Sequence, residues 1–170
     1  KVADQLRFTG IIRDVTDRNT AITNELAARD KFKDVVTSAL DAIVVIDEAG
    51  LIVEFNPASE AIFGFKSKDV VGRDMAETII PEHHRKAHND GILNYVKTGK
   101  GPVLNQRREI DAITASGESI LIELAVKQSV GPNGALFFGY MRDISMRKAE
   151  EKALVEAKER AEVANRAKAS

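Results

Sequence analysis

The stretch EAGLIVEFNPASEAIFGFKSKDVVGRDM, residues 48–75, places several signals of local structure next to one another. Gly50 follows a glutamate and an alanine between two apolar, β-branched runs, which predicts the tight turn of a β-hairpin. Asn56 and Pro57 suit the cap and the first position of a helix, and Gly64 suits its end. The stretch therefore predicts a pair of strands that leads directly into a short helix, the strands lying at 42–47 and 51–56.

The segments downstream of this hairpin separate into helices and then strands. Ser67 opens a second short helical turn that Gly72 ends, and a longer helix is expected between Pro81 and Gly99. Alternating apolar residues and glycine-containing turns then predict three strands, at 103–113, 119–128 and 135–143. Helices and strands that are segregated in this way favour an α+β fold with an antiparallel sheet.

A helix is expected on the N-terminal side of this region. Within residues 17–40, one apolar stripe is formed at helical spacing by Phe32, Val35, Val36 and Ala39.

The C-terminal segment, residues 146–170, consists mostly of alanine, glutamate, lysine and arginine. Its apolar residues alternate by three and four, which is the spacing of a coiled-coil seam, at Leu154, Ala157, Ala161 and Ala164. The seam is rich in alanine and only about three heptads long, so we expect it to need an adjoining domain to stay paired.

The chain nearly repeats one short phrase. Residues 8–18 read FTGIIRDVTDR and residues 137–147 read FFGYMRDISMR, and the two copies are separated by roughly the length of one small domain. We interpret the chain, which begins with a lysine, as a piece of a longer protein. Four parts are expected: the tail of an upstream domain at 1–17, a linker helix at 18–35, a main domain at 36–146 and a coiled-coil helix at 147–170.

Composition limits the functions that this chain can have. The 170 residues carry a net charge of −1, so no basic surface for nucleic acid is visible. Cysteine is absent, which excludes disulfides and thiolate sites and suits a reducing compartment such as the cytoplasm. No apolar run is long enough to span a membrane, and no signal peptide is present. No serine–histidine–acid set or phosphate-binding loop is visible, so we expect no catalysis.

The order of these elements closely resembles a PAS domain. The resemblance covers about residues 36–146 and is carried by the stretch at 48–75, by IIPEHHRKAHNDGILNYVKTGKGPVL at 79–104, by ASGESILIELAV at 115–126 and by GYMRDIS at 139–145. It implies a five-stranded antiparallel sheet with short helices packed on one face around a pocket, flanked by the linker helix and the coiled-coil helix. Residues 1–17 would then be the last strand of an upstream PAS domain.

The tail EAKERAEVANRAKAS, residues 156–170, resembles the helix that joins PAS domains to the dimerisation domain of hybrid sensor histidine kinases. This likeness implies a homodimer, a multi-PAS parent with kinase domains downstream, and a response regulator that receives the signal from the parent. The fragment itself would be a regulatory module and not an enzyme. Two alternatives are a structural PAS spacer without a ligand and the sensor module of a diguanylate cyclase.

The stretch Arg142-Asp143-Ile144-Ser145 matches the family's Asp-Ile-Thr junction, where the last strand becomes the output helix. Asp143 could accept hydrogen bonds from the first amides of that helix, or pair with Arg142 or Arg147, and Ser145 could act as a cap. The resemblance implies that Arg142, Asp143 and Ser145 relay a signal into the helix. The alternative is that Asp143 is only a helix cap and that the repeat reflects domain duplication.

The resemblance extends to haem-binding PAS domains of oxygen-sensor kinases. It implies that His88, on the long helix, would be the iron ligand of haem b, and that Arg108 would hydrogen-bond the oxygen ligand. Leu124 and Val126 would then form the apolar wall on that side. A neutral imidazole is a competent ligand of haem iron.

Other interpretations of these residues stay open. His88 could lie at the surface, and Arg108 could pair with Glu109 or Glu123 across strands. A zinc site is not favoured, because His83, His84 and His88 have neither cysteine nor the zinc-protease pattern beside them. Flavin chemistry is not favoured, because the chain has no cysteine or tryptophan. A small organic acid, or no ligand, is also possible.

Overall fold

The computed structural model describes residues 27–28, 30–101, 103–131 and 134–169. The chain divides into two compact units, residues 1–35 and 36–170. The described residues of the first unit are helical, and the helical segment continues into the second unit as far as Ser38, close to the predicted end at residue 40. The expected tail of an upstream domain, 1–17, lies outside the described residues, as does most of the N-terminal part of the linker helix.

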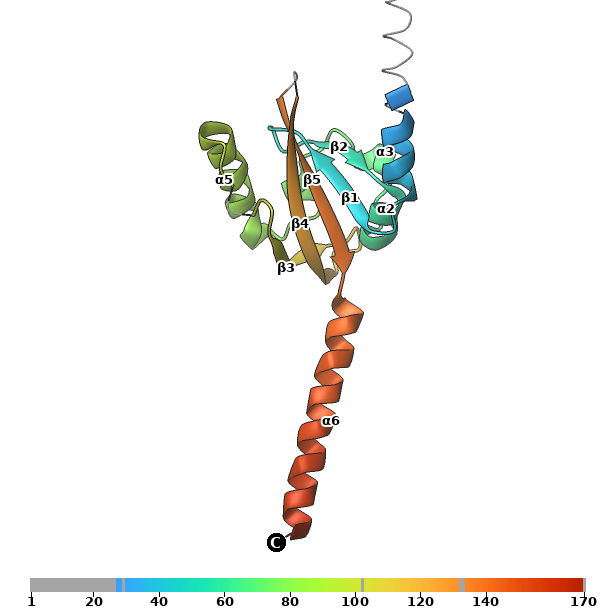
Figure 1. The fold of residues 1–170 in the computed structure, drawn as a ribbon, viewed down its shortest axis with the longest axis vertical. Helices are drawn as coiled ribbons and strands as arrows, with labels where there is room; N and C mark the ends of the chain where they lie inside the picture. Colours follow the sequence, from blue (N-terminus) through green and yellow to red (C-terminus); the bar gives the residue numbers. More distant parts are fainter. Residues whose placement is uncertain (1–26, 29, 102, 132–133, 170) are drawn as a thin grey trace, which may run out of the picture. The chain divides into compact units, whose positions relative to one another are not determined.

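The second unit contains the predicted five-stranded antiparallel sheet, with strand order β2-β1-β5-β4-β3 (Figure 1). Its strands are β1 (Ala42–Ile46), β2 (Ile52–Phe55), β3 (Arg107–Ile113), β4 (Ser119–Gly131) and β5 (Gly134–Asp143). Its helices are α2 (Pro57–Phe63), α3 (Ser67–Val70), α4 (Met75–Thr78), α5 (Glu82–Thr98) and α6 (Ser145–Ala169). The α+β class and the order of two strands, short helices, one longer helix and three strands are confirmed.

Three details differ from the predictions. β3 begins at Arg107 and not at residue 103, because Asn105 adopts a left-handed backbone conformation (φ 60°) that a regular strand cannot continue through. β4 extends to Gly131, beyond the predicted end at 128, because its pairing with β5 continues to the last residue before the turn. The additional turn α4 forms because the Asp74 side chain accepts a hydrogen bond from Ala76 N at 2.7 Å.

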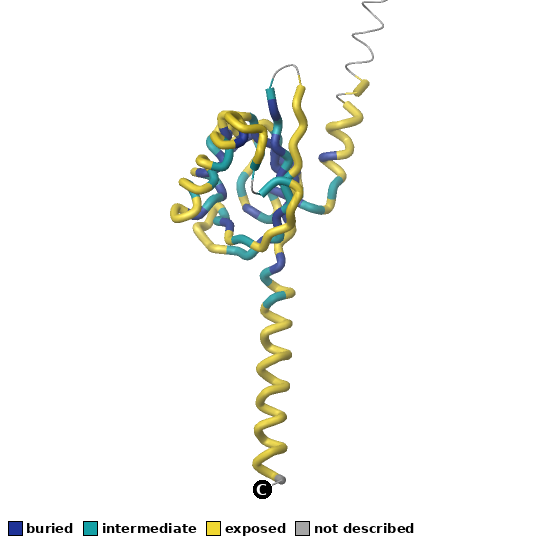
Figure 2. Tube along the Cα trace, turned by 60° about the vertical axis from the view of Figure 1, so that its left-hand side comes forward, coloured by how far each residue is buried: buried dark blue, intermediate teal, exposed yellow. Residues whose placement is uncertain are grey.

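The strand β1 is buried on both of its faces, which explains its unbroken apolar sequence. Ala42, Val44 and Ile46 contribute to the larger core, which also holds residues of α2–α5 such as Phe63 and Tyr95. On the opposite face a smaller cluster is formed by Val36, Ile43 and Val45, with Ala39, Leu136 and Phe138 packed against it. Buried positions are concentrated in the sheet and its helices, whereas nearly all of α6 is exposed (Figure 2).

Asn56 does more than cap α2. Its Oδ1 accepts hydrogen bonds from Ser59 N and from Ile43 N, each at 2.9 Å, and its Nδ2 donates to the carbonyl oxygens of Val36 and Asp41. The side chain is fully buried. Asn56 therefore joins α2 and β1 to the segment that precedes β1, and only the capping part of this role was predicted.

Candidate functional site

The junction between β5 and α6 shows how the output helix is attached to the sheet. Asp143 Oδ1 accepts a hydrogen bond from Ser145 N at 2.8 Å. Asp143 therefore caps the first turn of α6, which is one of the two roles left open by the sequence. Arg142 does not use Asp143 as its hydrogen-bond partner here, since its guanidinium is directed to Asp41.

The residues after Asp143 bind the neighbouring strand β4. Ser145 Oγ accepts a hydrogen bond from Leu121 N at 3.0 Å, and Ile144 N donates to Leu121 O at 2.9 Å. Ile144 is 2% exposed, so its side chain also anchors the junction in the core. The predicted capping by Ser145 is thus replaced by a contact that fastens the start of α6 to β4.

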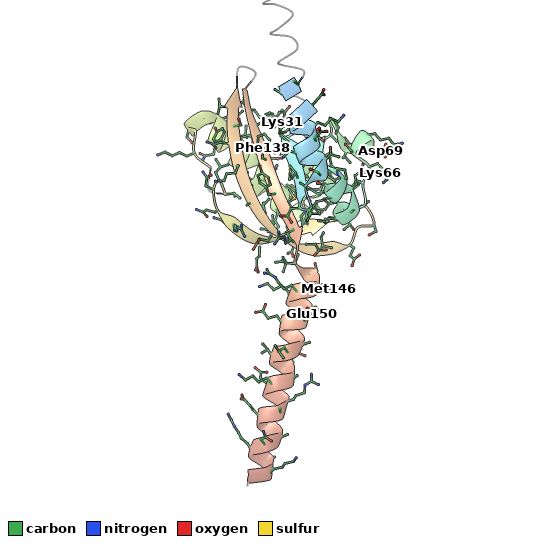
Figure 3. All side chains as sticks on the ribbon, turned by 45° about the vertical axis from the view of Figure 1, so that its right-hand side comes forward. Lys31, Lys66, Asp69, Phe138, Met146 and Glu150 are labelled. Atoms are coloured by element: carbon green, nitrogen blue, oxygen red, sulfur yellow. The ribbon has the colours of Figure 1, made fainter. Side chains whose placement is uncertain are left out.

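The first turns of α6 also reach the edge strand β3. Lys148 Nζ lies 3.0 Å from Glu109 Oε1, and Arg147 Nη2 lies 4.0 Å from the same oxygen. Such exposed ion pairs are individually weak, of order 1 kcal/mol or less. Together with the Leu121 contacts they connect α6 to β3 and β4. Figure 3 labels Met146 and Glu150 on this part of the helix, with Met146 77% exposed.

Arg142 connects the end of β5 to the start of β1. Its Nε and Nη2 donate to the two carboxylate oxygens of Asp41, at 3.0 Å and 2.9 Å. Hydrogen bonding to Asp41 and its negative charge raise the pKa of Arg142 above the usual value. Asp41 also offers its carbonyl oxygen to Asn56 Nδ2 at 3.1 Å. The segments that enter and leave the sheet are thereby tied to each other.

His88 lies on the side of α5 that includes Ile92 and Tyr95. It is half-buried, and this burial lowers its pKa below the usual value, against the opposing effects of Asn89 and Asp74. The ring is therefore neutral near pH 7, with Nδ1 at 3.2 Å from Asn89 Oδ1.

Arg108 and Leu124 are direct partners in the β3–β4 pairing. Leu124 is 8% exposed and Val126 is half-buried, and both contribute to the larger core. The Arg108 side chain is exposed, and its Nη2 donates to Gln106 Oε1 at 3.1 Å. Glu123, a proposed partner of Arg108, is instead paired with Arg107 at 3.3 Å.

The chemical types of these side chains fit a haem: a neutral imidazole on α5 and an apolar wall on β4. The space between α5 and the sheet is, however, occupied by protein. Tyr95 is 8% exposed, and its ring meets the ring of Phe137 edge-on, with centroids 4.9 Å apart. A porphyrin lying between α5 and β5 would require these two rings to separate.

The contacts that sequence analysis missed join residues far apart in the chain. Asp41 and Leu121 were not identified, and Glu109 was considered only as a partner of Arg108, although each of the three holds a predicted junction residue or the start of α6. A signal was available for Leu121 only, because the predicted pairing of the last strands places it near the end of β5. Nothing local marks Asp41 or Glu109.

The family comparison agrees with this architecture. The model of the PAS fold matches residues 30–144, most of the described chain. The chain therefore belongs to the PAS family, whose domains have a regulatory role.

Three curated relatives show the proteins in which similar domains occur. An uncharacterized protein of Azorhizobium caulinodans is 41% identical over 117 residues, which cover 69% of this chain and 16% of that protein. The oxygen sensor protein DosP of Escherichia coli is 28% identical, covering 64% of this chain and 13% of the relative. The cell-division control histidine kinase PdhS of Brucella ovis is 28% identical, covering 82% and 13%. The chain thus spans a small part of each relative.

Solved structures support the fold alone. The PAS domain of a protein from Colwellia psychrerythraea has a TM-score of 0.55 at 24% identity and covers 72% of this chain and 98% of its own. The PAS domain of an HTR-like protein from Haloarcula marismortui has a TM-score of 0.52 at 20% identity, covering 75% and 99%. None of the helices in the described ranges has the length and apolar character needed to cross a membrane.

Proposed function

We propose that this chain is a PAS sensory and dimerisation module of a cytoplasmic, multi-PAS hybrid sensor histidine kinase. It would relay a ligand signal, or a signal from an upstream PAS domain, through the Asp143 junction into α6. The observation that carries this proposal is the attachment of Ile144 and Ser145 to Leu121 of β4. Similarity to a histidine kinase over 82% of the chain supports the class of parent protein.

The junction is suited to transmit a change in the sheet. Leu121 is held by both Ile144 and Ser145, and Glu109 is held by Lys148, so a shift of β3 or β4 moves the groups that orient the first turn of α6. Regulation requires that the signal change the free-energy difference between two orientations of α6. A change of about 1–3 kcal/mol is enough. The change would alter the geometry of the kinase domains and so the phosphate flow to a response regulator.

The output helix would act as half of a parallel homodimer. Leu154, the largest side chain of the predicted seam, is 72% exposed, and Ala157, Ala161 and Ala164 are exposed too, so the seam is available to a second helix. The linker helix at 18–35 would form the second part of the dimer contact. Pairing of α6 fixes the positions of whatever domains follow it.

The relay is tested by Asp143→Ala and Ser145→Ala in the whole parent protein. We expect each change to shift autophosphorylation or its dependence on the stimulus at least threefold, because the first turn of α6 loses its attachment. Asp69→Ala on α3 is the matched control and should leave output unchanged. A structural spacer would lose stability with unaltered output, and a diguanylate cyclase would show cyclic dinucleotide synthesis in place of autophosphorylation.

A second candidate function is oxygen sensing through haem b. The observation in its favour is the half-buried, neutral imidazole of His88 on α5, and a relative named as an oxygen sensor supports it. His88 would hold the haem, which would supply an iron atom for binding a diatomic gas. Leu124 and Val126 would exclude water from that side, and Arg108 would leave Gln106 to donate a hydrogen bond into the site.

The haem proposal is tested by absorption spectroscopy after reconstitution. We expect a shifted Soret band that His88→Ala abolishes and that His84→Ala, a matched change on the same helix, leaves in place. Binding should also break the contact between Tyr95 and Phe137, which ring-proton NMR shifts of Phe137 would report. If the unsubstituted chain gives only the spectrum of free haem, the haem proposal is wrong. The relay proposal is not affected by that result.

A further inference from the structure

Three possible metal ligands meet outside the junction and the His88 face. His83 and His84 lie in the first turn of α5, and Asp111 lies on β3. One ligand atom from each residue, a ring nitrogen or a carboxylate oxygen, lies within 4.8 Å of the others, and all three side chains are exposed. The two histidine rings lie side by side, with their centroids 4.1 Å apart.

The backbone holds these side chains near one another. Ile113 N donates a hydrogen bond to Ile79 O at 2.9 Å, which fixes the segment before α5 against the end of β3. His84 N donates to Pro81 O at 2.9 Å and sets the first turn of the helix. The imidazoles therefore lie near Asp111 because the backbone segments that carry them are linked by hydrogen bonds.

This donor set matches the preferences of divalent transition metals. Imidazole nitrogen suits zinc, copper and nickel, whereas magnesium and calcium prefer oxygen ligands alone. With metal–ligand bonds of about 2.0–2.2 Å, donor atoms around one tetrahedral ion lie roughly 3.4 Å apart. The donor atoms therefore have to approach one another by at most about 1.4 Å, which rotation of three exposed side chains can provide.

We propose that His83, His84 and Asp111 bind one divalent transition-metal ion of the zinc type, with water in the remaining coordination position. The carboxylate is essential, because the N-terminal end of a helix is unfavourable for a cation and Asp111 supplies the compensating negative charge. The ion would cross-link the start of α5 to the edge strand β3. This site is separate from the haem proposal, since His88 is not one of its ligands.

The site is tested by calorimetric titration of the metal-free chain with zinc chloride. We expect one zinc ion per chain, and an affinity at least tenfold weaker in His84→Ala and in Asp111→Asn. Asp69→Asn is the carboxylate control, because Asp69 lies on α3, and it should bind as the unsubstituted chain does (Figure 3). Circular dichroism of each variant establishes that the fold is retained.

His88→Ala distinguishes this site from a different pair on the same helix. His84 and His88 are one turn apart and could themselves hold an ion. Unchanged zinc binding in His88→Ala supports the proposal, whereas a loss equal to that of His84→Ala overturns it. Unchanged binding in Asp111→Asn also overturns it. If a variant does not fold, zinc-edge X-ray absorption of the unsubstituted chain should show two imidazoles around the ion, and any other number contradicts the assignment.

Discussion

Ser145 Oγ accepts a hydrogen bond from Leu121 N at 3.0 Å, and this bond joins the first residue of the output helix to the beginning of β4. The bond is partly buried, so its donor cannot turn freely to water. The adjacent bond from Ile144 N to Leu121 O makes the attachment two-sided. A single residue of β4 therefore holds both residues at which the chain changes from strand to helix.

Ser145→Ala should destabilise the domain by about 1 kcal/mol, because Leu121 N loses its partner. Urea unfolding measures this loss, and hydrogen exchange should become faster at Leu121 and in the first turn of α6. Ser129→Ala, at an exposed position of the same strand, is the matched control and should change neither quantity. An unaltered exchange rate at Leu121 would show that the bond does not hold the junction.

Asn56→Ala should be much more damaging, by roughly 2–4 kcal/mol, because several buried backbone groups lose their partners together. Asn56→Asp separates the two halves of the network. The aspartate can still accept from Ile43 N and Ser59 N but cannot donate to Val36 O and Asp41 O. We expect an intermediate loss in urea unfolding, with Asn165→Ala on α6 as a neutral control.

The Arg142–Asp41 pair should contribute little to stability despite its two hydrogen bonds. Both side chains are largely exposed, at 62% and 44%, so solvent screens the charges. A double-mutant cycle of Arg142→Ala and Asp41→Ala should give a small coupling free energy that falls as salt is added. A much larger, salt-independent coupling would contradict this view.

His88 should make the domain less stable in mild acid. Its pKa is lowered in the folded state, so the unfolded chain binds more protons as the pH falls through the usual histidine range. The contribution of neutral His88 to the free energy of unfolding is complete above the unfolded pKa of about 6.5. It is lost as the pH falls toward the lower pKa of the folded state. Urea unfolding at pH 7.5 and 5.5 should show a smaller pH effect in His88→Gln than in His84→Gln, with a chelator present in both.

Local chemistry explains which parts of the fold could be predicted. Asn56 with Pro57 marks a helix start, and Gly64 and Gly99 take the left-handed conformation at helix ends, with φ of 77° and 69°. These signals lie within a few residues of the feature they specify. The strand order could not be read in this way, because the resemblance to the family implied a five-stranded antiparallel sheet but not the order of its strands.

The candidate site was only partly predictable for the same reason. Asp143 was identified because capping is a local property. Its neighbour Arg142, however, donates a hydrogen bond to Asp41, which lies 101 residues earlier in the sequence. The three histidines did not indicate a metal site, because the third ligand, Asp111, comes from another element. Long-range register, and not residue type, decides these contacts.

Pairing of α6 is the prediction on which the proposed relay depends most strongly. The 25-residue helix α6 leaves Leu154 and the alanines of the predicted seam exposed, so dimerisation should stabilise it. The predicted seam contains Ala161, whereas Ala149 lies off it, which offers two alanine-to-glutamate changes of identical chemistry. Ala161→Glu should place like charges at the interface and shift sedimentation equilibrium toward the monomer by at least tenfold in dissociation constant, and Ala149→Glu should not. Helix content measured by circular dichroism should fall together with dimerisation. A chain that stays monomeric at every concentration, or one in which the two changes act equally, would leave the relay without a paired helix to move.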